Sequence, residues 1–522
     1  MKSNFLSIPS LLVLVLCFIV TPSKLQGQQS SKLKILGAKD AKIDVKNGTR
    51  ILVGNVRFKQ GKTLMYCDSA ISYTDSKLIK SYGHVKIVDK AQKTTMTGDS
   101  LVFDGGKHLG QLRGTITLTS ETQILKTRRL DFDTRTKSTK FYGGGVITST
   151  EDNSVLKSEK GYYNTETKIF FFKDNVEYVT DDYTILSDTM EYNTELEIVT
   201  FHGPTDIISD SNTIYCEKGF FDQVKAFSNF SGHVKMVSTE QTLFADSVVY
   251  YENTKSGQSF GHVIILDTAN RTEVYGDYAR YNNIEKTSLV TGSLRLVMAF
   301  TDDTLQLHSD TLLTYMDPTG KHRLLNAFHH VKFFKPDMQG KCDSLTFSEL
   351  DSTIRMFYSP VVWIDSNQLT GKEIIIKQVD GDIRGMDIFD EAFIASEEDS
   401  ALYNQIRGKS LHAFFRNNEI YKINVNRSGQ TIYYVRDEDK ELMGMNRLDC
   451  SNMSIFIDSE GINNIKFYQK PDGIFLPMAK VSSEMKLLRY FYWRESERPK
   501  TEDDIFNWTP VPSYILLRRQ SR

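Results

Sequence analysis

Carboxylate side chains recur along this chain at a nearly constant spacing. They lie in a short motif, as in Ala245-Asp-Ser-Val-Val-Tyr250, and occur at Asp68, Asp99, Asp188, Asp246, Asp277, Asp310 and Asp343. A calcium site needs several oxygen ligands converging from one loop, whereas this motif supplies one carboxylate per repeat. Aspartate at a bend commonly accepts hydrogen bonds from nearby backbone amides. We therefore predict that these acids cap bends and bind no metal.

The histidines also recur without the companions that chemistry would need. His84, His233 and His262 stand in Gly-His-Val triplets, and His329-His330 is the only adjacent pair. None has Cys or Glu partners at the spacing of metal ligands. The sequence also lacks the nucleophile-elbow, zinc-protease and phosphate-loop motifs. We predict no catalytic site, no metal, no cofactor and no enzymatic activity.

Cysteines are few and lie far apart. Cys67, Cys216 and Cys342 each occupy the small position directly before a recurring acid. Separations of several repeats exclude a disulfide between them. They are expected to be small packed residues.

One basic cluster stands out, at Lys126-Thr-Arg-Arg129. Such a cluster could contact lipid phosphates, or it could simply form a solvated face. The chain as a whole is nearly neutral, with 64 basic and 66 acidic residues. This balance argues against nucleic acid as a partner.

The first residues are typical of an export signal. Lys2 precedes the apolar run Leu11–Val20, and Gly27 offers a small residue for cleavage. The run is short for a membrane span, so we expect a signal peptide over residues 1–27. The mature chain is then expected in the periplasm, possibly associated with the outer membrane.

The elements that position these residues are set by a repeat. A glycine or turn-like residue recurs two places before an apolar residue, from Gly54-Asn-Val56 to Ser359-Pro-Val361. Successive copies are 29 to 31 residues apart, with one step of 37. A unit of this length with two apolar segments cannot bury its apolar face alone, so neighbouring units must stack.

Alternation within both motifs indicates β-strands with one buried face. The residue four places after the acid is usually aromatic, and the Gly-x-Val motif carries apolar residues two apart. The resulting interior positions, which are candidate lipid-binding residues, are Phe103, Phe132, Tyr163, Tyr192, Phe221, Tyr250, Tyr281, Phe347, Val85, Ile87, Val234, Met236, Val263 and Ile265. The same pattern is expected for an ordinary closed core.

These observations predict an all-β fold, an elongated repeat scaffold of stacked strands similar to a β-solenoid. Regular repeats of about 30 residues are expected over residues 28–378. Irregular repeats with larger insertions should follow over 379–494, and a polar tail over 495–522.

The paired motifs resemble those of the LptA/OstA family of periplasmic lipopolysaccharide-transport proteins. Gly54-Asn-Val56 and Ala245-Asp-Ser-Val-Val-Tyr250 match best, and the many copies are similar to the long OstA-like form found in Bacteroidetes. The resemblance implies a twisted, open β-jelly roll that holds acyl chains between two sheets. It implies lipopolysaccharide as ligand, edge-strand pairing with other transport components, and possible end-to-end self-association.

Two other functions fit parts of the pattern. A structural or adhesive β-solenoid would bury a closed core and bind no lipid. A polysaccharide-active enzyme on a stacked β scaffold should cluster Asp, Arg or Lys in one atypical stretch, whereas the polar residues here repeat evenly. Transport of lipopolysaccharide across the periplasm to the outer membrane is the leading hypothesis.

Overall fold

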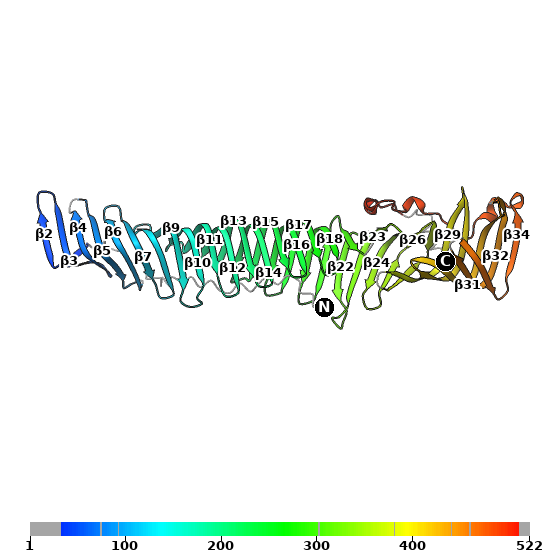
Figure 1. Cartoon of the computed structure of the whole chain (residues 1–522), viewed down its shortest axis with the longest axis horizontal. Helices are drawn as coiled ribbons and strands as arrows, with labels where there is room; N and C mark the ends of the chain where they lie inside the picture. Colours follow the sequence, from blue (N-terminus) through cyan, green and yellow to red (C-terminus); the bar gives the residue numbers. More distant parts are fainter. Residues whose placement is uncertain are drawn as a thin grey trace. The chain divides into compact units, whose positions relative to one another are not determined.

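The computed structural model describes residues 33–510, except 74–75, 92, 301–302, 380–381, 440 and 459–460. These residues form 34 strands and four short 3-10 helices, and no α-helix occurs among them (Figure 1). None of the described helices is long and apolar enough to cross a membrane. The chain divides into two compact units, one ending at Gly257 and the other beginning at Gln258. The expected signal peptide lies outside the described residues.

The first unit is a succession of antiparallel hairpins. Its strands are β1 (Lys34–Gly37), β2 (Asp40–Asp44), β3 (Thr49–Gln60), β4 (Thr63–Tyr73), β5 (Leu78–Asp89), β6 (Thr94–Asp104), β7 (Leu109–Thr119), β8 (Gln123–Asp133), β9 (Ser138–Ser149), β10 (Val155–Asn164), β11 (Ile169–Val179), β12 (Tyr183–Asn193), β13 (Ile198–Ser209), β14 (Asn212–Asp222), β15 (Phe227–Ser238) and β16 (Gln241–Tyr251), and the unit ends within β17 (Ser256–Asp267). From β3 to β16, each strand pairs with the next one in the sequence.

The second unit continues the same hairpin order. Its strands are β18 (Thr272–Asn282), β19 (Thr287–Thr291), β20 (Arg295–Ala299), β21 (Thr304–His308), β22 (Thr311–Met316), β23 (Arg323–Lys335), β24 (Met338–Ser348), β25 (Thr353–Phe357), β26 (Val361–Ile364), β27 (Asn367–Thr370), β28 (Glu373–Val379), β29 (Asp382–Asp399), β30 (Leu402–Arg416), β31 (Glu419–Arg436), β32 (Leu442–Asp458), β33 (Gly461–Tyr468) and β34 (Asp472–Pro477). The 3-10 helices are η1 (Met478–Lys480), η2 (Ser483–Lys486), η3 (Glu495–Glu497) and η4 (Glu502–Phe506).

Most strands bend at their midpoint, at the Gly-x-Val motif. In β3 the pairing register skips Gly54 and Asn55, whose φ angles are 74° and 48°. A β-bulge of this kind bends a strand, and glycine adopts positive φ without strain. We call this bend the corner of the repeat.

The corners divide the sheet into two layers. In β3 and β4, half-sheet I contains Thr49–Val53 and Ser69–Tyr73, and half-sheet II contains Val56–Gln60 and Thr63–Cys67. Later strands divide in the same way. The chain is therefore an all-β jelly roll, as the resemblance implied, and each bent strand contributes to both layers.

The core lies between the two half-sheets because alternate side chains point inward. On β3, Leu52 is buried before the corner, and Val56 and Phe58 are buried after it. Full burial of one such side chain contributes about 1.5–3 kcal/mol. The β-branched and aromatic residues that dominate these positions also favour strands.

Corners interrupt the strands of the second unit more strongly. One bent strand becomes the pair β19 and β20, and another becomes β25 and β26. Further along, β29 to β32 lengthen to 15–18 residues and carry corners at Asp390–Glu391 and Arg427–Ser428. The repeat thus persists with longer strands through the region where larger insertions were expected.

Candidate functional site

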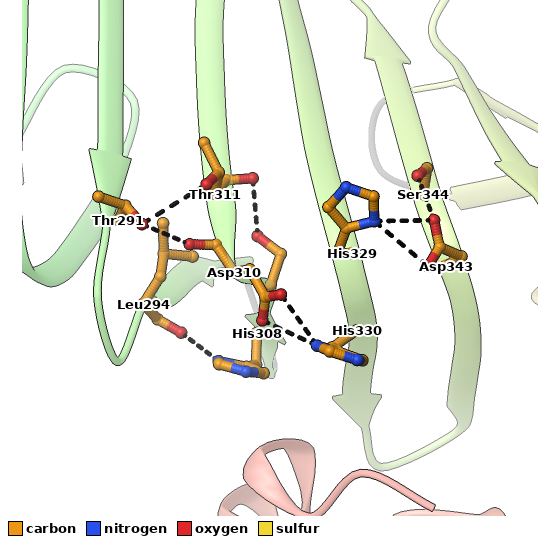
Figure 2. Close-up of polar contacts among 10 residues, drawn as sticks. Thr291, Leu294, His308, Asp310, Thr311, His329, His330, Asp343 and Ser344 are labelled. Atoms are coloured by element: carbon orange, nitrogen blue, oxygen red, sulfur yellow. Dashed lines mark hydrogen bonds and ion pairs between the residues drawn. The ribbon is translucent and has the colours of Figure 1, made fainter. Parts of the chain in front are cut away.

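The recurring acids lie at the corners, as predicted. The Asp99 carboxylate accepts a hydrogen bond from the backbone N–H of Thr115, at 3.0 Å, in the corner of the next strand. Asp68 pairs with His84 at 2.7 Å in the same arrangement. Figure 2 shows two further cases, with Asp310 beside His330 and Asp343 beside His329. Asp99 therefore caps a bend as predicted, whereas Asp68, Asp310 and Asp343 pair with histidine side chains, and capping by the other acids stays a prediction.

Histidine side chains at the corners pair with these carboxylates. The Asp68 carboxylate holds the pKa of the exposed His84 imidazole above its usual value, by hydrogen bonding and by its charge. His233 pairs with Glu217 at 3.0 Å in an equivalent corner. These pairs are exposed and contribute little to stability.

The candidate lipid-binding residues all point between the half-sheets. Ten are buried: Tyr163, Tyr192, Phe221, Tyr250, Tyr281, Val85, Ile87, Val234, Met236 and Val263. Four are half-buried: Phe103, Phe132, Phe347 and Ile265. The burial of most of these residues agrees with an inward face, and their contact with lipid stays a prediction.

Aromatic residues gather at one side of this interior. In half-sheet I they lie one or two residues before the hairpin turn, as Phe132 does in β8 and Phe221 does in β14. Tyr163 stacks on Phe170 with ring centroids 4.0 Å apart, and Phe103 stacks on Phe132 at 6.4 Å. This aromatic stripe therefore follows the turn side of the interior, opposite the corners.

The backbone joins the half-sheets on the corner side. Each hairpin turn connects two strand halves within the same layer, such as Gln60 to Thr63 in half-sheet II. Backbone hydrogen bonds between turns also stay within one layer, for example from Thr134 N–H to His108 O. On the turn side, apolar contacts are thus the main interaction between the layers.

The interior carries polar groups that remain neutral. Burial raises the pKa of the Cys216 thiol to about 12 and raises the pKa of the Tyr250 hydroxyl as well. Cys67, Cys216, Cys342 and Cys450 are all buried and free. Burial thus keeps these thiol and hydroxyl groups in their neutral form.

A second covered surface was missed by the sequence analysis. Residues 478–510, here called the strap, cross the outer face of half-sheet II in the second unit and lie above β23 and β26 in Figure 1. Four buried glutamines contact it along its length: Gln306, Gln339, Gln368 and Gln405.

Two of these glutamines pair with the strap backbone as a neighbouring strand would. Gln368 donates from Nε2 to Tyr492 O at 2.9 Å and accepts from Arg494 N–H at 2.6 Å. Gln405 does the same with Lys486 O and Leu488 N–H, both at 2.8 Å. Each glutamine side-chain amide thus makes the pair of hydrogen bonds with the strap backbone that a peptide group of a neighbouring strand would make.

The strap also seals a buried ion cluster. Lys341 contacts Glu497 at 2.5 Å, and Arg494 contacts the same carboxylate at 2.7 Å. Burial alone would raise the pKa of Glu497, but the two cations outweigh it and hold that pKa below its usual value. Burial, with help from the charge of Lys341, lowers the pKa of nearby Lys332 to about 8.

These contacts show that part of the expected polar tail over residues 495–522 is packed against the sheet. The part that the structure describes, residues 495–510, contains the buried residues Glu497 and Ile505. The sequence did carry a signal for the strap. In four consecutive repeats, a glutamine stands three places before the small residue of the acid motif, or before the glycine at the equivalent position. These pairs are Gln306 and Ser309, Gln339 and Cys342, Gln368 and Gly371, and Gln405 and Gly408.

Comparison with known proteins agrees with this architecture. Residues 31–188 match the family model described as OstA-like protein. Residues 207–382 match the model described as LptA/(LptD N-terminal domain) LPS transport protein. No curated protein matches the chain.

Among solved structures, the chain is similar to LptH of Pseudomonas aeruginosa, described as the LptA-homologous periplasmic component of the lipopolysaccharide transport device. The identity is 14%, the TM-score is 0.20, and the match covers 21% of this chain and 81% of that chain.

Hairpins that bend at a corner and enclose an apolar interior define this chain as an antiparallel β-jelly-roll repeat protein. With the two family matches over most of its repeats, it belongs to the LptA/OstA family of lipopolysaccharide-transport proteins.

Proposed function

We propose that the chain binds the acyl chains of lipopolysaccharide between its two half-sheets and carries this lipid across the periplasm to the outer membrane, without catalysing a reaction. One observation supports this most directly. The aromatic stripe follows the turn side of the interior, where apolar contacts are the main interaction between the layers.

The free energy of apolar contacts favours an interior that opens on the turn side. Separating the layers there breaks apolar contacts, which an inserted acyl chain restores at about 0.8 kcal/mol for each buried methylene. The rings of Phe103 and Phe132 are half-buried, as is that of Phe347, whereas the tyrosines of the aromatic stripe are buried. Phe103 and Phe132 are the entry point that we propose for the lipid.

A photo-crosslinking residue on β14 tests the proposal. Phe220 and Phe221 are adjacent and chemically identical, but Phe221 points inward while Phe220 contacts Phe227 on the outer face. Benzoylphenylalanine at position 221 is expected to capture lipopolysaccharide in cells, and at position 220 to capture much less. Equal capture at both positions would exclude an interior site.

A closed structural core is the second candidate. The complete burial of Tyr250, Phe172 and Phe201 favours it, because these rings fill the interior without a ligand. In that case neither position 220 nor position 221 captures lipid, and no lipid co-purifies with the chain in mass spectrometry.

A further inference from the structure

The corners follow one rule in most repeats of the chain. The acid of one strand lies against the glycine in the corner of the next strand. A Cβ atom built on Gly83 would lie 2.3 Å from Asp68 Oδ2, and one on Gly114 would lie 2.0 Å from Asp99 Oδ2. The same relation holds between Asp188 and Gly203, Glu217 and Gly232, and Asp277 and Gly292. In each such corner, the protein's own carboxylate side chain fills the space beside the glycine.

One repeat of the first unit breaks this rule. Arg128 of β8 replaces the acid, and the next corner is Gly143–Gly144, with φ angles of 77° and 89°. A Cβ built on either glycine would meet no atom within 4 Å. Both glycines are also skipped by the pairing registers: the register with β8 passes from Gly145 to Phe141, and the register with β10 passes from Gly145 to Tyr142. This corner has the backbone of the others without their carboxylate.

Positive charge surrounds the open corner. Lys126, Arg128 and Arg129 of β8 are all exposed. The Arg129 guanidinium lies over the ring of Tyr142, 5.8 Å from its centroid, and so is held beside the corner.

Two nearby side chains change the net positive charge at this corner: Arg113 adds to it and Glu159 opposes it. Arg113 also lies over Tyr142, but its charge is partly compensated by Asp131 at 2.6 Å. The nearest unpaired carboxylate in the described register is Glu159 of β10, which lies opposite the same corner and is exposed. The cations outnumber the acids here.

We infer that the Gly143–Gly144 corner is an anion-binding site that accepts a phosphate monoester. Successive backbone N–H groups at positive φ form a concave anion receptor, and guanidinium groups match phosphate oxygens in pairs. In a related corner, where Gly114 alone has positive φ, the N–H of Thr115 binds the Asp99 carboxylate at 3.0 Å, so a corner amide of this chain does bind an anion. Several cations favour a doubly charged group over a carboxylate.

The site goes beyond the proposed function because it lies on the exposed side of the corner, away from the apolar interior. Its phosphate can come from a lipid headgroup or from a free phosphate. The two sources are distinguished by comparing glucosamine 1-phosphate, which carries the sugar of a headgroup without acyl chains, with inorganic phosphate.

The test is calorimetric titration of the exported full chain with each probe. We expect one binding site per chain, with tighter binding of glucosamine 1-phosphate for a headgroup site and of inorganic phosphate for a free-phosphate site. Arg128→Asp supplies the carboxylate that the other repeats use, so it should fold normally and weaken binding about tenfold or more. Arg128→Lys should retain most of the affinity.

The matched control is Lys86→Asp, which makes the same charge change beside a corner already filled by Asp68. It should leave the affinity within about twofold, because its corner is closed. Equal weakening in both variants would indicate a diffuse charge effect and overturn the site, as would no binding by the unchanged chain. Crosslinking at position 221 does not depend on this corner, so either proposal can fail alone.

Discussion

At the residue scale, the sequence was most informative where one side chain performs one repeated task. Asp99 and Asp68 were predicted to cap bends because an isolated carboxylate in a turn has few other roles; Asp99 does so through the Thr115 N–H, whereas Asp68 pairs with the His84 side chain. Gln368 and Gln405 were not recognised, because a glutamine on the outer face of a strand usually contacts water. Their partners in the strap lie more than 80 residues away in sequence, so the repeated glutamine spacing can be interpreted only once the position of the strap is known.

Gln368→Ala should release the middle of the strap. It removes two hydrogen bonds and takes from the buried Arg494 N–H the acceptor that Gln368 supplies, at a cost of about 1–3 kcal/mol. Hydrogen exchange of residues 483–498 should accelerate. The control is Gln111→Ala on the exposed face of β7, which should change exchange little. Unchanged exchange in the Gln368 variant would contradict the pairing.

Acid should loosen the strap through Glu497. Because the folded pKa of Glu497 is below its usual value, its contribution is complete above the unfolded pKa of about 4.3 and is lost as the pH falls through the folded value. Trp493 and Trp508 of the strap should then report exposure by a red shift of their fluorescence below about pH 4. In Glu497→Gln this acid transition should be absent. A transition unchanged by that substitution would assign it to other carboxylates.

At the element scale, alternation predicted the strands and their inward faces because a strand has one buried side. It could not predict that Val361–Ile364 are buried on both sides, since the second cover is the strap. That cover also builds a small outer core, in which Leu488 packs with Phe393 and Tyr434. The strap itself has only short 3-10 turns, so no helix or strand periodicity marks it.

The amino-terminal edge offers a test of partner assembly. Among the described strands, β2 pairs with β3 alone, and Ile43 on it is exposed. An unpaired strand edge readily joins another strand, and proline removes the N–H that such pairing uses. Ile43→Pro should weaken self-association in sedimentation velocity, whereas Ile43→Ala, which keeps the N–H, should not. Loss in both variants would assign the contact to the side chain.

At the scale of the whole molecule, the repeat was predictable because each unit uses the same corner and the same inward residues. The division into two compact units at Gly257 was not, because it falls within β17 and no motif changes there. In repeat proteins, stability is approximately a sum of neighbouring contacts. Damage to one repeat should therefore remain local.

Leu112→Ala tests this locality. Leu112 is fully buried in β7, and truncating such a leucine costs about 2–5 kcal/mol. Hydrogen exchange should accelerate in β6 to β8 and stay unchanged in β29 to β32. An equal acceleration throughout the chain would mean that the molecule unfolds as one cooperative unit.

The position of the strap in the chain has a consequence for the order of folding. Each hairpin can pair with its predecessor as soon as it emerges from a translocation channel, but the strap is synthesised after every strand that it covers. Until it arrives, Lys341 and the apolar outer residues near Phe393 remain exposed to proteases and chaperones. We therefore expect the second unit to become protease-resistant only after residues 478–510 have been synthesised.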